Sequence, residues 1–167
     1  MVFLGLLFDR KEEHQIAAKS RGGVMQNQVN TFQWNCLDGF YENGKEDLCI
    51  LNALPVGTFP RQYRQLLLPS GPWQYHGHTH YRLGALNLPF FKQWSRQRKC
   101  KKQLRRLQDK EIVIYSPYLP YLKAVKHLDP SYKVTLIVPD LPAYYDYGRA
   151  GGLKRLLRKW NNRSIDR

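Results

Sequence analysis

One acidic residue, Asp140, follows a strand-like run and stands between Pro139 and Pro142. The run, residues 134–138, is short, apolar and mostly β-branched, which predicts a strand buried on both faces of a sheet. The prolines cannot continue a central strand, and ligands of open α/β sheets bind just past the carboxyl ends of the strands. Asp140 is therefore a candidate catalytic residue. The alternative is a turn residue, because Asp favours turns for purely local reasons.

A glycine pair, Gly22 and Gly23, lies between a predicted first strand and the start of a predicted helix. Backbone N–H groups and the positive end of the helix dipole suit such a loop to an anion, here a phosphate or a sugar. Neither GxGxxG nor GxxxxGK[ST] is present. Glycine pairs in such loops often serve only the turn, so both interpretations stay open.

Eight Lys and Arg residues and no acid lie between residues 92 and 106, with Phe90, Phe91 and Trp94 at the start. Such a helix can lie in a membrane interface, with its rings at the headgroup boundary and its cations over anionic lipid. It can also follow a nucleic-acid backbone, or be a solvated face of an ordinary helix. The membrane surface is the favoured partner and nucleic acid the less favoured one. The expected contact residues are Lys92, Trp94, Arg98, Lys101, Lys102 and Arg105.

Three alternating histidines occur in the stretch from His76 to His80. No Cys, Asp or Glu nearby completes a metal-ligand set, so a surface loop or a polar loop that faces an acceptor is favoured over a metal site. The cysteines, Cys36, Cys49 and Cys100, form no CxxC pair and indicate a reducing compartment. No metal and no cofactor are expected.

The elements that must position these residues alternate along the chain. Predicted strands cover residues 2–8, 48–54, 83–88, 112–115 and 134–138, and predicted helices cover residues 24–40, 89–107, 117–128 and 153–160. Residues 9–23 are expected to form a polar loop, and residues 57–82 are irregular. Alternating strands and helices predict an α/β, three-layer, Rossmann-like domain with a mostly parallel sheet. A chain of 167 residues suits one such domain.

The charge is divided unevenly along the chain. Residues 1–80 carry seven Lys/Arg and seven Asp/Glu, whereas residues 81–167 carry twenty and six, so the whole excess of +14 lies in the second half. This asymmetry predicts a polyanionic partner. No apolar run approaches the ~20 residues that span a bilayer, and the N-terminal run lacks the features of a signal peptide.

Five stretches, in their order along the chain, together resemble the N-terminal half of a bacterial family 4 glycosyltransferase. They are GGVMQNQVN at 22–30, LPVG at 54–57, NLP at 87–89, IYSPY at 114–118 and VPDLP at 138–142. The resemblance implies one half of a GT-B fold, in which two Rossmann-like domains face a cleft. The N-terminal half binds the acceptor, and the C-terminal half holds most of the nucleotide sugar.

The resemblance also implies roles for the matched positions. Gly22 and Gly23 would place N–H groups near the donor phosphates or the sugar, and Ser116 and Tyr118 would line the acceptor side, with Asn27 a further acceptor-side residue. Asp140 falls where many relatives have a histidine that contacts the transferred sugar.

The family's second domain has no counterpart in this sequence, since no Glu follows Glu111 to supply its paired glutamates. We therefore expect residues 1–167 to form the acceptor-side domain alone, a fragment of a retaining transferase that is inactive by itself. The expected partners are a nucleotide sugar donor, a glycan or lipid-linked acceptor, and the inner face of the cell membrane, in a cytoplasmic setting. A stand-alone basic module for anionic membrane or nucleic acid is the alternative.

Overall fold

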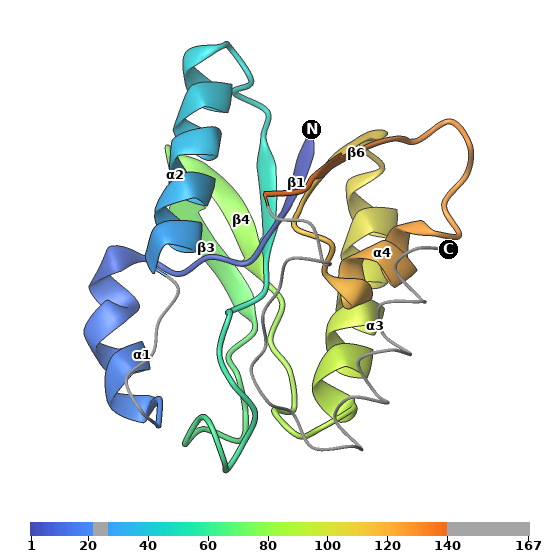
Figure 1. Cartoon of the computed structure of the whole chain (residues 1–167). Coiled ribbons are helices and arrows are strands. Elements are labelled where there is room, and N and C mark those ends of the chain that lie inside the picture. The colour runs from blue at the N-terminus through green and yellow to red at the C-terminus, as the bar shows by residue number, and fades with distance from the viewer. Residues whose placement is uncertain (22–26, 140–167) are drawn as a thin grey trace.

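The computed structural model describes residues 1–21 and 27–139 (Figure 1), and of Asn27 only the backbone. The elements in chain order are β1 (Val2–Gly5), η1 (Arg10–Glu12), α1 (Glu13–Lys19), α2 (Asn27–Glu42), β2 (Cys49–Asn52), β3 (Gly71–Tyr75), β4 (His78–Arg82), α3 (Phe91–Leu107), β5 (Glu111–Tyr115), α4 (Leu119–Val125) and β6 (Lys133–Ile137). Gly22, Gly23, Asp140 and the helix expected at 153–160 lie outside the described residues.

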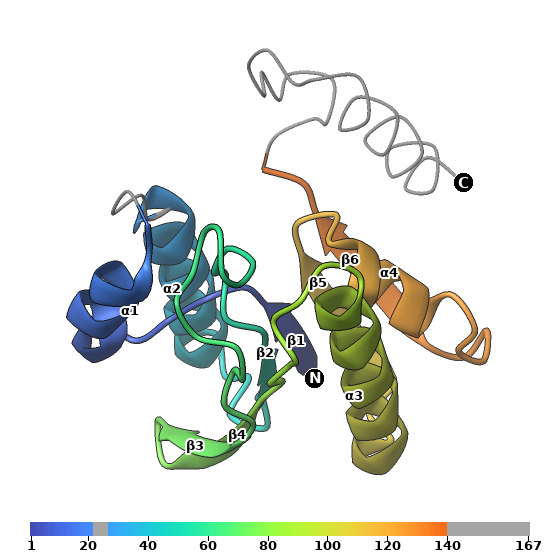
Figure 2. The ribbon, with the colours of Figure 1, turned by 90° about the horizontal axis from the view of Figure 1, so that it is seen from below.

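Six strands form one sheet in the order β3-β4-β2-β1-β5-β6. Every pairing is parallel except that of β3 with β4, which is an antiparallel hairpin. Helix α2 lies against one face of the sheet, and α3 and α4 lie against the other (Figure 2). The prediction of an α/β fold with a mostly parallel sheet is confirmed.

The central strands are buried from both sides. Val2 and Leu4 of β1 pack with Leu104 of α3 on one face, and Phe3 packs with Leu37 of α2 on the other. Burial on both faces explains why β1 and β5 are continuously apolar and do not alternate with polar residues. Each large apolar side chain removed from water stabilises the fold by roughly 1.5–3 kcal/mol.

The strand order places a switch point beside β1. From β1 the chain builds outward through β2 to β4, and α3 then carries it back to β5 on the other side of β1. The loops that leave the carboxyl ends of β1 and β5 therefore separate to opposite faces. In doubly wound sheets this separation opens the crevice in which ligands bind.

Residues 10–19 are helical, so the prediction of a polar loop is wrong for this part of the chain. Asp9 accepts a hydrogen bond from the backbone N–H of Lys11, and the Glu12 side chain returns to the backbone of Asp9. This capping box starts η1, which leads directly into α1, where Ile16 is buried. A cap is a local feature that a hydrophobic-period search does not detect.

The region expected to be irregular, residues 57–82, contains the β3–β4 hairpin. His76 (φ 47°) and Gly77 (φ 74°) both have positive φ, as the central residues of a type I′ hairpin turn do. The histidine stretch is consequently a turn followed by a strand, and the expected surface loop is wrong for residues 78–80.

Residues 83–88 do not form the predicted strand. Within this segment Leu86 makes a single bridge to Leu67, and Gly84 lies against the backbone of Leu68 and Pro69. A Cβ at Gly84 would sit 2.5 Å from both of their carbonyl oxygens. Backbone hydrogen bonds hold the segment to this loop, from the Leu68 N–H to the Ala85 carbonyl (2.9 Å) and from the Asn87 N–H to the Leu66 carbonyl (2.7 Å).

The predicted position of β6 is right and its predicted burial is wrong. β6 pairs with β5 alone among the described strands, at the edge of the sheet. Val134 and Leu136 are 43% and 40% exposed. A short apolar run looks the same in a central strand and in an edge strand, since the sequence does not encode which neighbours flank it.

Candidate functional site

The backbone just past β1 is held by side-chain amides. Three amides each form two hydrogen bonds to one residue of this segment, accepting from its N–H and donating to its C=O, at 2.6–3.0 Å. The amide of Gln33 pairs with residue 6, that of Asn52 with residue 7 and that of Asn30 with residue 8. All three amides are buried. The loop therefore leaves the sheet in a fixed conformation with these backbone groups satisfied, and it forms one wall of the carboxyl edge.

The turn after β5 forms the neighbouring wall. Ser116 has φ 69°, a left-handed conformation that costs a non-glycine residue roughly 1–2 kcal/mol. Its N–H donates to the carbonyl of Ile137 in β6, and its carbonyl accepts from the N–H of Tyr118. Strained residues of this kind often mark ligand-binding turns. Ser116 and Tyr118, predicted to line the acceptor side, are both half-buried at this edge.

Helix α3 presents two cations to the same edge. The Arg96 guanidinium donates through Nη1 to the Tyr118 hydroxyl (2.9 Å) and through Nη2 to the Leu54 carbonyl (2.6 Å). One turn earlier, Lys92 Nζ donates to the carbonyls of Val56 and Gly57 in the loop that follows β2. The two side chains join α3 to the β2 loop and, through Tyr118, to the β5 turn.

Burial changes the protonation of Lys92. Removal of its ammonium from water, together with the nearby Arg96 charge, lowers the pKa of Lys92 to about 7. The membrane contact expected of Lys92 is therefore wrong, because its side chain is only 9% exposed and turned toward the sheet. The buried stripe of α3 is Lys92, Arg96, Cys100 and Leu104.

The opposite face of α3 carries exposed aromatic and cationic side chains. Phe90, Phe91 and Trp94, the rings expected at a membrane headgroup boundary, are 74%, 54% and 54% exposed. At about 100° per residue, Arg98 and Arg105 fall on this same outer side. The Arg98 guanidinium lies 4.8 Å from the centre of the Trp94 ring, a cation–π contact.

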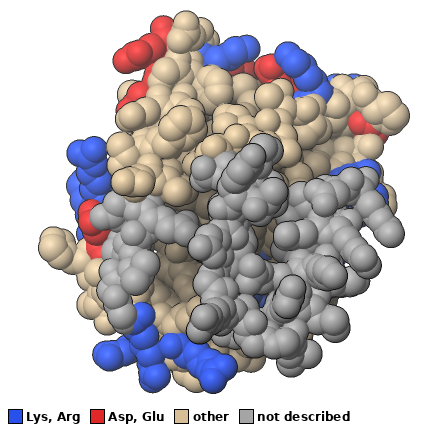
Figure 3. Space-filling view, viewed as in Figure 1, with Lys and Arg blue, Asp and Glu red and all other residues tan. Residues whose placement is uncertain are grey.

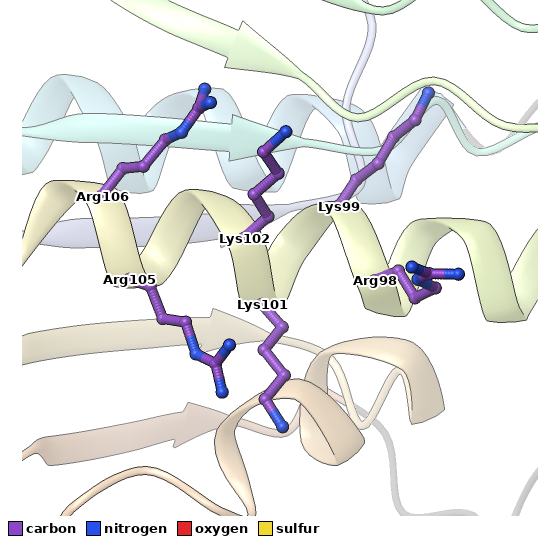
Figure 4. Close-up of a pocket in the computed structure, with 6 residues that line it drawn as sticks. All are labelled: Arg98, Lys99, Lys101, Lys102, Arg105 and Arg106. Carbon is purple, nitrogen blue, oxygen red and sulfur yellow. The ribbon is translucent and has the colours of Figure 1, made fainter.

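Six cations line a shallow pocket along α3. Lys99, Lys102 and Arg106 extend to one side of the helix, whereas Lys101 and Arg105 extend to the other (Figure 4). Viewed as in Figure 1, the lower third of the molecule shows only Lys and Arg among the charged residues that are coloured (Figure 3). Three of the predicted contact residues, Arg98, Lys102 and Arg105, are exposed, and Lys101 is half-buried.

Other predicted site residues cannot be assigned contacts. Gly22, Gly23 and Asp140 lie outside the described residues, and Asn27 is seen only as the first residue of α2. Sequence reasoning missed Arg96 and the inward direction of Lys92. The signal that could have found them is their four-residue spacing with Cys100 and Leu104, which marks one helix face.

Comparison of the chain with family models, with curated proteins and with solved structures finds no match. Among the described residues, no helix has the length and apolar character to cross a membrane.

The histidines at the β3–β4 hairpin belong to an aromatic cluster. His76 stacks on Tyr41 with 4.5 Å between ring centres, and Tyr75 contacts Trp34 at 4.9 Å. Within residues 1–21 and 27–139, no group of three or more His, Cys, Asp or Glu residues could hold a metal ion. His80 is buried and extends the sheet, because its Nδ1 accepts from the N–H of Ile50 at 3.1 Å.

Acid is expected to weaken the fold through His80. Burial lowers the pKa of His80 below its ordinary value of 6.5, since a charged ring would lose both water and the Ile50 hydrogen bond. Above pH ~6.5 the ring is neutral in both states and its contribution to stability is complete. As the pH falls below ~6.5 the unfolded chain binds the proton first, so the free energy of unfolding decreases until the folded-state pKa is passed.

Urea unfolding at several pH values between 5 and 8 measures this effect. His80→Gln should lose part of the decrease below pH ~6.5, whereas His127→Gln, a change at an exposed histidine, should keep it. An identical pH profile in the wild-type chain and His80→Gln would contradict the assignment.

Proposed function

We propose that this chain is the acceptor-binding half of a retaining glycosyltransferase, which moves a sugar from a nucleotide diphosphate sugar to a glycan or lipid-linked acceptor. The observation that carries the proposal is the strained Ser116 turn beside the switch point between β1 and β5. Ligands of doubly wound sheets bind at that crevice. The motif order described above, from the glycine pair to the Asp140 segment, supports the same assignment.

In this proposal, each wall of the crevice has a separate task. Ser116 and Tyr118 contact the acceptor, and the β1 loop with Gly22 and Gly23 faces the donor phosphates. Asp140 acts at the transferred sugar. The chemistry rests on positioning the two substrates and on stabilising the departing diphosphate electrostatically. A donor-binding domain supplies the other side of the cleft.

Sugar transfer, measured with and without an added donor-binding domain, tests the proposal. We expect no turnover by the chain alone and turnover in the mixture, with loss of activity in Tyr118→Ala and retention in Lys102→Ala, which lies on the outer face of α3. Rapid turnover by the isolated chain would contradict the division into two halves.

A second function, binding to an anionic membrane surface, is favoured by the outer face of α3. That face combines exposed Phe91 and Trp94 with a row of cations. Rings of this kind enter the headgroup region while cations lie over anionic lipid. The two functions are compatible, since an enzyme that glycosylates a lipid-linked acceptor works at the membrane. Nucleic acid is the competing partner for the same face.

A further inference from the structure

Two cations under the carboxyl edge of the sheet have no acid to balance them within residues 1–21 and 27–139. Lys92 and Arg96 are 9% and 2% exposed, and neither forms an ion pair with any described residue. Their acceptors are three backbone carbonyls and the Tyr118 hydroxyl, all neutral. Burying a charge without a counter-charge is costly, and here two like charges lie one helical turn apart.

Arg82, at the same edge, is a cation whose charge is balanced by a carboxylate. Its Nη1 and Nη2 donate to the two carboxylate oxygens of Glu12, at 2.7 and 2.8 Å. This bidentate pair occupies Glu12, so Glu12 does not serve Arg96. Arg82 of β4 thus has a carboxylate partner, whereas Arg96 of α3 has none among the described acids.

The nearby acids of this half of the molecule lie elsewhere. Between residues 48 and 139 the acids are Asp109, Glu111 and Asp129. Asp109 pairs with the N-terminal ammonium, and Glu111 pairs with Lys45 and Lys133. Asp109 and Glu111 stand where β5 begins, which is the amino edge. These two paired acids therefore lie at the opposite edge of the sheet from Lys92 and Arg96.

Hydrogen-bond donors remain unused at the two cations. The Nε of Arg96 is buried and has no acceptor. Lys92 donates to two carbonyls and has a third N–H, since an ammonium carries three donors. An oxyanion would supply both the missing negative charge and several oxygen atoms that accept hydrogen bonds from these donors. The planar guanidinium of arginine matches the geometry of such a group.

We propose that Lys92 and Arg96 form an oxyanion subsite that takes a phosphate-type group at the carboxyl edge, between the β2 loop and the Ser116–Tyr118 turn. Val56, Gly57 and Tyr118, which contact the two cations, are half-buried, and the anion reaches the cations from this side. The evidence for the subsite is these two buried cations, so the subsite does not depend on the proposal that the chain takes part in glycosyl transfer. Within the proposed function it assigns an acceptor that carries a phosphate group.

Binding of inorganic phosphate and inorganic pyrophosphate to the full chain tests the subsite, with chloride at the same ionic strength as the control. The expected result is a saturable rise in Tm with one or both probes and none with chloride. Preference for phosphate indicates a phosphomonoester ligand, and preference for pyrophosphate indicates a diphosphate. No rise with either probe overturns the proposal.

Two matched variants test the role of Lys92 in this subsite. Lys92→Met is expected to weaken probe binding at least about tenfold, the value of a hydrogen bond to a charged group. Lys126→Met makes the same change at an exposed lysine outside α3 and should bind as the wild type does. Equal binding by Lys92→Met and the wild type would show that the two buried cations only join α3 to the β2 loop.

A measurement on the unaltered chain covers the case in which variants at Lys92 or Arg96 fail to fold. The NMR shift of the Lys92 Cε carbon is followed against pH, with and without the bound probe. An anion beside the ammonium stabilises its charged form, so the pKa of Lys92 should rise from about 7. An unchanged titration in the presence of saturating probe overturns the proposal, whereas failure of sugar transfer leaves it standing.

Discussion

Replacing Arg98, Lys101, Lys102 and Arg105 together with glutamine is expected to weaken binding to anionic vesicles by about a thousandfold. Each Lys or Arg near an anionic surface contributes about 1 kcal/mol, and 1.4 kcal/mol is about tenfold in affinity, so four cations account for about three powers of ten. Sedimentation with vesicles of anionic and of neutral lipid measures the effect. Binding of the wild type to the anionic vesicles should also fall as salt is added.

A charge-matched control decides whether the outer face of α3 or the net charge is responsible. Replacing Arg10, Arg61, Arg64 and Lys126, all exposed and all outside α3, removes the same charge and should cost much less. Equal losses in the two variants would contradict a specific surface on α3. Gel shift with DNA and RNA at physiological salt completes the comparison. Tight nucleic-acid binding without vesicle binding would replace the membrane by nucleic acid.

Asn52→Leu is expected to lower the free energy of unfolding by about 4 kcal/mol. The change keeps a side chain of similar size but removes the amide that pairs with the N–H and C=O of Leu7, a residue 1% exposed. Each buried backbone group left without a partner costs about 1–3 kcal/mol. Urea unfolding measures the loss.

Asn43→Leu is the matched control for this prediction. Asn43 donates to the carbonyl of Gly39 at an exposed position at the end of α2, where water can replace the lost bond. We expect a change within about 0.5 kcal/mol, as for most surface substitutions. Similar losses at Asn43 and Asn52 would mean that the β1 loop is not held as described.

Much of the fold follows from local pattern alone. The continuous apolar runs of β1, β2 and β5 predicted these strands correctly, and a helix was predicted where α2 lies. Runs of this length are constrained by burial on both faces, which few other arrangements satisfy. The β3–β4 hairpin was not predicted, because apolar and polar residues alternate only weakly in its strands. Its turn is His76-Gly77, which is not one of the usual pairs such as Asn-Gly or Asp-Gly.

The chemistry of the carboxyl edge was less accessible to sequence reasoning. Ser116 and Tyr118 were predicted from a motif, and the structure places them at the edge where the Arg96 guanidinium also lies. The amides of Asn30, Gln33 and Asn52 were not singled out, since an amide within a helix or strand gives no local sign of its partner. Their partners lie 22 to 45 residues away in the chain.

The amino-acid sequence by itself determined the alternation of strands and helices, the basic character of the second half and the presence of an aromatic and cationic helix. Only the tertiary structure decided which side of that helix faces the sheet. Its spacing fits two stripes, one with Phe91, Trp94 and Arg98, and one with Lys92, Arg96 and Cys100. The second is buried because the β2 loop and Tyr118 offer oxygen atoms that accept its hydrogen bonds, and those oxygens come together only when the sheet has formed.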